Sequence, residues 1–323
     1  MRSSLLRSLF TTPGPAVAVS IAPEQVAAVH VESGPKGPLV RGHARLPLPP
    51  GAVTPAVQGT NLADPAAVAE ALDGVLRRLP RRPRRIGLLL PDAAAKVSMV
   101  RFASVPARAA DLDPMLRWQV RKTVPFDVDE AQVDWMPGRT TARDEQEFVT
   151  VLAHRAVVEE YERVCAAAGM HAGLVDLLGF SLIEAAVACG ATDPTADWLL
   201  VLVGGGSSTL AVVRDRHPLL FRTVADGQPP GDLVHQTAMY YEDRLGGGGL
   251  SHALIAGNGA ARHGLEAIRR VIEGRLGIAV EPIAKRLARL LPDRDGLDAA
   301  ALDGLAAPLG LLLRERPSRR APA

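Results

Sequence analysis

The stretch Asp197–Arg214, DWLLVLVGGGSSTLAVVR, decides the fold of this chain. Two apolar runs flank three glycines and three hydroxyl residues, a pattern that predicts two strands joined by a tight turn. Because glycine tolerates positive φ and lets other groups approach the backbone closely, such a turn can offer bare N–H groups to an anion. Two interpretations stand side by side: a phosphate-binding loop, or an ordinary turn in a buried hairpin.

The composition indicates a globular protein without a nucleic-acid partner. The chain has 323 residues, of which 47% are hydrophobic, enough for one large domain or two lobes. Its net charge of +2 gives no bulk attraction to nucleic acid. Cys165 and Cys189 lie in apolar sequence without histidines at metal spacing, so we expect free thiols and no metal site. No run of 18 apolar residues predicts a membrane span, and we expect a cytoplasmic protein.

Strand and helix signals alternate along the chain in two similar rounds. The first round consists of a strand pair over 16–32 with a turn at 22–24, a strand near 39–44, a helix over 65–78 capped by Asn61 or Asp64, and strands over 86–90 and 96–102. The second consists of the opening hairpin, a strand over 219–224, a helix over 232–245, a strand over 253–256, a turn at 257–259, a helix over 265–276, a strand over 278–280 and a helix near 302–314.

The segment between the two rounds begins with a helix signal. Asp113 as N-cap and Pro114 at the first helical position predict a helix that runs to about Thr123, because Pro125 ends it. Further on, the pattern predicts a strand over 148–153, a helix over 157–168 and an apolar helix over 174–188.

The order of these motifs resembles the actin-like ATPase superfamily, and within it the family of the type IV pilus assembly protein PilM. That family is related to FtsA and to the cytoplasmic part of type II secretion L proteins. The stretches that carry the resemblance are LRWQVRKTVPF at 116–126, DEAQVDW at 129–135, the strand and helix of 148–169, AMYYED at 238–243 and LIAGNGA at 254–260.

The resemblance implies an α/β, RNase H-like duplicated fold with two lobes. Lobe 1 would span 1–190 and include a PilM/FtsA-type inserted subdomain at about 102–176. Lobe 2 would span 191–316, followed by a disordered tail at 317–323. Only DGQPPG at 226–231 stands where the family carries a small subdomain of lobe 2, so that subdomain is expected to be reduced or absent.

Proteins of this kind hold ATP and Mg²⁺ between the lobes. The residues at the implied nucleotide site are Ser20, Ala22, Gln25, Gly204, Gly205, Gly206, Ser207, Ser208, Gly257 and Gly259. Ser20 and Leu202 stand where the family has aspartates, and Pro23 has no N–H to give a phosphate. We therefore expect a pseudo-ATPase that does not hydrolyse ATP and binds it weakly or not at all.

By the same resemblance, the chain is expected to be a scaffold at the inner-membrane platform of a type IV pilus or type II secretion machine. The cytoplasmic tail of a PilN-like single-span membrane protein would lie between lobe 1 and the inserted subdomain, near Trp118, Lys122, Pro125 and Phe126. Core packing is an equal alternative for Trp118 and Phe126. Membrane attachment, at the inner face, would come only through this partner, and other platform proteins would bind as well.

Two other functions stay open at this point. One is a working nucleotide-binding switch or weak ATPase that regulates the assembly. The other is a filament-former of the FtsA type, which the shortened lobe 2 disfavours. A serine hydrolase centred on Ser207 is not supported, because the sequence lacks a Gly-x-Ser-x-Gly elbow there.

Overall fold

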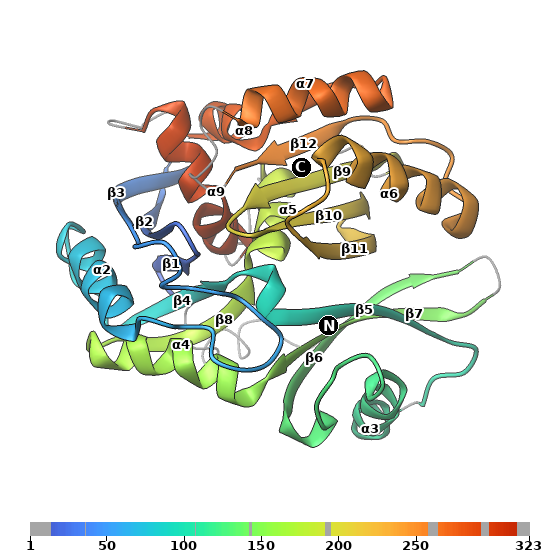
Figure 1. The fold of residues 1–323 in the computed structure, drawn as a ribbon, viewed down its shortest axis with the longest axis horizontal. Helices are drawn as coiled ribbons and strands as arrows, with labels where there is room; N and C mark the ends of the chain where they lie inside the picture. The colour runs from blue at the N-terminus through green and yellow to red at the C-terminus, as the bar shows by residue number, and fades with distance from the viewer. Residues whose placement is uncertain are drawn as a thin grey trace.

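The computed structural model describes residues 14–35, 37–106, 108–141, 144–190, 195–257, 264–291 and 297–314. Three β-sheets and their covering helices form two lobes and an inserted subdomain (Figure 1). Two predictions lie outside the described residues: Gly259 of the nucleotide site and the tail at 317–323.

The sheet of lobe 1 has the order β3-β2-β1-β4-β8. Its strands are β1 (Val17–Ile21), β2 (Gln25–Gly34), β3 (Gly37–Pro47), β4 (Arg85–Leu90) and β8 (His171–Leu177). The strands β1, β2 and β3 pair antiparallel to one another, whereas β4 is parallel to both β1 and β8. The helices α2 (Pro65–Arg77) and α4 (Arg155–Ala167) belong to this lobe and contact each other. Asp64, not Asn61, caps α2, because its carboxylate accepts the N–H of Ala67 at 3.0 Å.

Lobe 2 repeats this arrangement in the order β11-β10-β9-β12-β13. Its strands are β9 (Asp197–Gly204), β10 (Ser207–Arg214), β11 (His217–Ala225), β12 (Ala253–Ala256) and β13 (Val280–Pro282). Again the first three are antiparallel and the rest parallel. The same order and directions in both lobes confirm the duplicated fold.

The strand β9 is apolar throughout because both of its faces are buried. Leu200 and Leu202 join the core between the two sheets, whereas Leu199 and Val201 join a second core beneath α6 (Pro230–Leu245) and α7 (Leu265–Leu276). The expected hairpin of 197–214 is therefore confirmed, with its first strand buried on both faces.

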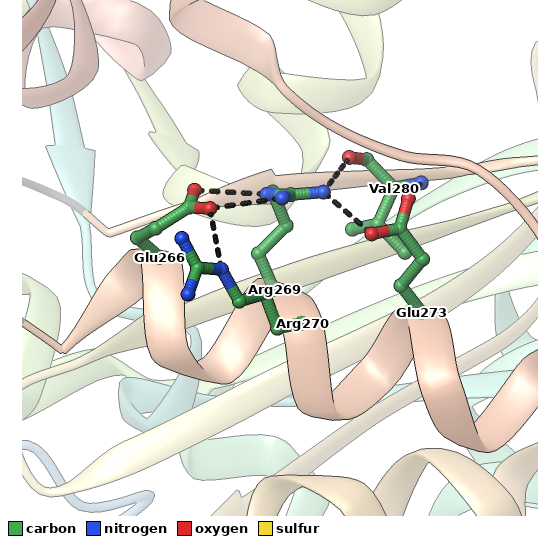
Figure 2. A network of polar contacts seen from close by, with 5 residues as sticks. All are labelled: Glu266, Arg269, Arg270, Glu273 and Val280. Atoms are coloured by element: carbon green, nitrogen blue, oxygen red, sulfur yellow. Dashed lines mark hydrogen bonds and ion pairs between the residues drawn. The ribbon is translucent and has the colours of Figure 1, made fainter.

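The helix α7 is tied to β13 by one arginine (Figure 2). Arg269 pairs with Glu266 and Glu273 at 2.8 Å, and it donates to the carbonyl oxygen of Val280 at 3.3 Å. Arg270 adds a second contact to Glu266, and these guanidinium groups lower the pKa of Glu266 to about 2. The network fixes α7 at the edge of the lobe 2 sheet.

Two helices, α5 (Leu178–Ala188) and α9 (Ala299–Arg314), lie between the two sheets (Figure 1). Helix α5 contacts β8 and β10, whereas α9 contacts β1, β2 and the short helix α8 (Ile283–Leu290), which the sequence analysis missed. The two helices cross at Gly310, where an added Cβ would overlap the carbonyl oxygen of Ser181. The crossing therefore requires glycine.

The inserted subdomain is a sheet in the order β5-β7-β6 with one helix. It consists of β5 (Ala95–Phe102), α3 (Ala109–Val120), β6 (Ala131–Thr140) and β7 (Gln146–His154), with the 3₁₀ helices η1 (Asp92–Ala94) and η2 (Val128–Glu130) before β5 and β6. Its own core includes Leu116, Val120 and Phe148. Because β8 pairs with β4 in lobe 1, we propose Ala95–His154, rather than 102–176, as the subdomain.

Two helix predictions need correction. Helix α3 begins at Ala109 and ends at Val120, so Asp113 is not its N-cap and Pro114 lies inside it. The expected helix over 174–188 is strand β8 followed by α5, since pairing with β4 outweighs the helical pattern of 174–177.

Within the part of the chain that the structure describes, no helix has both the length and the apolar character needed to cross a bilayer.

The helix crossing at Gly310 gives a first prediction. Gly310→Ala should lower the free energy of unfolding by about 3 kcal/mol, because the new methyl group must push α9 away from Ser181. Gly274→Ala in α7 is the matched control, since its Cβ would meet nothing within 4 Å. It should raise stability by up to about 1 kcal/mol. Urea unfolding followed by circular dichroism measures both, and equal effects would contradict the assignment of a tight crossing.

Candidate functional site

The turns of the two hairpins meet where the lobes face each other. Gly205 adopts a φ of +35°, and an added Cβ would lie 2.5 Å from Cγ of Pro23 and 2.7 Å from Oε1 of Glu24. The gap between the turns measures about 20 Å³. That is the space of roughly one water molecule.

The predicted residues of the first turn are used within the fold. The hydroxyl of Ser20 is buried and forms no hydrogen bond with a described residue. The N–H of Ala22 donates to the carbonyl of Gln25 at 3.0 Å, which closes the turn. The Gln25 side chain donates to the carbonyl oxygen of Gly304 at 3.5 Å. This carbonyl lacks its helical hydrogen bond, because Pro308, four residues later in α9, has no N–H.

The predicted residues of the second turn form the end of the hairpin. Gly204 pairs with Ser207 across Gly205 and Gly206, and the Gly206 carbonyl accepts the N–H of Asp226 at 2.9 Å. Ser208 is buried within β10. This turn lies against the first turn, so the structure does bring the two predicted phosphate loops together.

Of the predicted adenosine turn, the structure describes Gly257. The N–H of Gly257 donates to the carboxylate of Asp303 on α9 at 3.0 Å. An added Cβ at Gly257 would also lie 3.1 Å from the other oxygen of that carboxylate. The glycine is thus used in binding α9 to lobe 2.

Two acidic residues beside the turns were missed by the sequence analysis. Burial raises the pKa of Glu24, although the N–H of Gly205 opposes the shift. Burial likewise raises the pKa of Asp92 to about 6, against the opposing effects of the Gly179 N–H, which donates at 2.9 Å, and of Thr209. The signal for Asp92 was its place after the buried strand β4, since functional side chains in α/β folds gather at carboxyl ends of strands.

A magnesium nucleotide does not fit between the turns as these residues lie. A gap of about 20 Å³ holds no phosphate group, and Pro23 fills the place of a donor N–H. Among the described residues, no group of three or more His, Cys, Asp or Glu side chains is arranged to hold a metal ion.

A cavity of about 1060 Å³ lies beside the joined turns and between the lobes. We call it the interlobe cleft. It is lined from lobe 1 by the loop 53–57, from the inserted subdomain by Lys96 and 123–125, and from lobe 2 by Ser207, 220–223 and Tyr240.

A second cavity of about 520 Å³ separates lobe 1 from the inserted subdomain. We call it the β6–β8 groove, because 131–134 of β6 and 175–177 of β8 line it. Both are outer strands of their sheets, so each has one edge that no described strand pairs with. Val133, Val151 and Val175 contribute apolar surface. Charges of both signs also line the groove, from Arg117, Arg155, Asp134 and Asp176.

The four predicted partner-binding residues do not line this groove. Trp118 is 62% exposed on α3 beneath the guanidinium of Arg121, 4.1 Å from its ring centroid. Lys122 is exposed, Pro125 lines the interlobe cleft, and Phe126 packs edge-on against His154 at 4.7 Å between ring centroids. Arg117, one residue before Trp118, is the part of α3 that reaches the groove.

Comparison with known families identifies the chain. The family model described as type IV pilus assembly protein PilM matches residues 18–239. The chain belongs to the PilM family. No curated protein sequence matches it significantly.

A solved structure of a PilM–PilN complex has the same fold as this chain. A chain of a PilM–PilN type IV pilus biogenesis complex superposes with a TM-score of 0.76 at 18% identity, covering 94% of this chain and 99% of that one. EutJ, an ethanolamine utilization protein from Carboxydothermus hydrogenoformans, gives 0.48 at 14% identity, with 94% and 90% covered. The cytoplasmic domain of EpsL, from the type II secretion system of Vibrio cholerae, gives 0.45 at 12%, with 75% and 81% covered.

Asp92 gives a prediction about pH. Its folded-state pKa of about 6 lies above the ordinary value of 3.8, so the folded protein binds the proton more tightly and loses stability as pH rises from about 4 to above 6. Asp92→Asn keeps the acceptor for Gly179 and removes the buried charge. Urea unfolding measures the free energy of unfolding of Asp92→Asn minus that of the wild type. This difference should be about 2 kcal/mol larger at pH 7.5 than at pH 4.5. A difference that does not change with pH would contradict this.

Proposed function

We propose that this chain is a scaffold of the inner-membrane platform of a type IV pilus, and that it binds the cytoplasmic tail of a PilN-like membrane protein in the β6–β8 groove. The observation that carries the proposal is the groove itself, which lies between lobe 1 and the inserted subdomain. Membership of the PilM family and the likeness to a chain of a PilM–PilN complex support it.

The groove has the features that an extended peptide needs. The outer strands β6 and β8 present unpaired backbone edges, to which a peptide can add as a further strand. Val133, Val151 and Val175 provide an apolar floor for alternate side chains of that peptide. The partner would supply the membrane attachment at the inner, cytoplasmic face, and other platform proteins would bind the remaining surface.

The nucleotide site is degenerate in this proposal. Ser20 and Leu202 replace the two carboxylates that the family uses beside Mg²⁺, and hard oxygen ligands are what Mg²⁺ requires. The joined turns fill the place of the phosphates with Pro23 and Glu24. The two hairpins would then connect the lobes rather than bind a ligand.

The binding proposal is tested with a labelled peptide of the PilN-like protein's cytoplasmic tail, by fluorescence anisotropy. Val175→Lys should raise the Kd at least tenfold, because it places a charge on the apolar floor of the groove. Val271→Lys, which changes a 54% exposed valine on α7, is the matched control and should leave the Kd unchanged.

Trp118→Ala distinguishes the groove from the outer face of α3. We expect its Kd to stay within about twofold of wild type, since Trp118 does not line the groove. If Trp118→Ala weakens binding and Val175→Lys does not, the tail binds α3 and the assignment of the groove is wrong. Thermal melts confirm that each variant is folded.

The degenerate site is tested by scanning fluorimetry. We expect the same Tm with millimolar ATP and Mg²⁺ as with Mg²⁺ alone, because a ligand raises Tm only by binding the folded state. An increase in Tm together with release of phosphate would instead support the nucleotide switch or weak ATPase.

A further inference from the structure

The interlobe cleft has no place in the function proposed above. It is lined by other residues than the β6–β8 groove, except that Ala95 at the start of β5 lines both. Gly205, Gly206 and Ser207 of the second turn line one end of it, but Pro23 and Gly257 do not, so it overlaps only in part with the position that the resemblance implies for a nucleotide. Its walls come from both lobes and from the inserted subdomain.

The charge of the cleft is of one sign. Lys96 and Arg222 line it, and no aspartate or glutamate does. Neither cation forms an ion pair with a residue in the described ranges. Hydroxyl groups of Thr123, Ser207 and Thr223 surround them. Such a surface favours a ligand that carries carboxylates or other anions.

One wall of the cleft is a strand with a free edge. The strand β11 is the outer strand of the lobe 2 sheet and pairs only with β10 among the described strands. Five of its residues, 220–223 and Ala225, line the cleft. A free strand edge binds extended chains through main-chain hydrogen bonds, whereas a small anion makes no use of it.

We propose that the interlobe cleft binds an acidic segment of a partner protein, extended along β11 with its carboxylates on Lys96 and Arg222. Residues 1–13 carry Arg2 and Arg7 without an acid, and residues 315–323 carry three arginines and one glutamate, so neither stretch is the acidic segment. Since the segment touches both lobes, its binding holds them at one separation.

The test is a selection from a random dodecapeptide library displayed on phage. The wild-type protein is the bait, and the double variant Lys96→Glu, Arg222→Glu removes peptides that bind elsewhere. Enriched sequences should be rich in Asp and Glu. By fluorescence anisotropy, their Kd should rise at least tenfold in the double variant. Arg81→Glu, the same change on an exposed loop of lobe 1 away from the cleft, should leave Kd unchanged.

Hydrogen exchange provides the second measurement. Amides of 220–225 should exchange more slowly when the selected peptide is bound, because β11 gains a neighbour. Lys96→Glu alone should weaken binding at least threefold. Because the Lys96 side chain is exposed, this change should not disturb folding, so it separates loss of binding from misfolding. The proposal is overturned if no acidic peptide survives the counter-selection, if exchange at β11 is unchanged, or if ATP or inorganic phosphate displaces the peptide.

The outcome is separable from that of the scaffold proposal. The double variant should bind the tail of the PilN-like protein as wild type does, because neither Lys96 nor Arg222 lines the β6–β8 groove. Loss of both kinds of binding in the double variant would show that one site serves both, and would contradict the proposal.

Discussion

The close crossing of α5 and α9 at Gly310 is the constraint on which the rest of the molecule depends. With no side chain at this position, the backbone of α9 lies against the Ser181 carbonyl, and the two helices share one core with both sheets. A core of this density deforms little, so the distance between the sheets is fixed. That distance places the first hairpin turn directly against the second. The contact between Pro23 and Gly205 is thus a consequence of how α5 and α9 pack.

Contact between the turns carries an energetic cost that the helices offset. Asp92 is buried and Glu24 half-buried beside the turns, and their raised pKa values reflect the cost of burying their charge. Hydrogen bonds from Gly179 and Gly205 repay part of it. A ligand between the turns would have to separate them and disturb the packing at Gly310. This coupling is why the proposed loss of nucleotide binding and the closed arrangement of the lobes belong together.

Local sequence signals predicted most elements but not the sites. The glycine turn of 204–206 and the cap at Asp64 depend on neighbours in sequence, and both predictions are confirmed. The strand β8 was mistaken for helix because its partner β4 lies some 85 residues away. The resemblance predicted a groove between lobe 1 and the inserted subdomain, and the residues that it implied for partner binding do not line the β6–β8 groove. Only the tertiary fold decides that Arg117 faces the groove and Trp118 does not.

The inserted subdomain forms a wall of two cavities in which a ligand would have different mechanical consequences. A ligand in the β6–β8 groove touches lobe 1 and the subdomain only, so its affinity does not depend on the angle between the lobes. A segment in the interlobe cleft touches both lobes, so its affinity changes if they separate. By linkage, whatever binds there favours the lobe separation that it binds best. In a relative that binds nucleotide, the phosphates between the turns would exert this control. Here the joined turns leave the interlobe cleft as the place where a partner can act on both lobes at once.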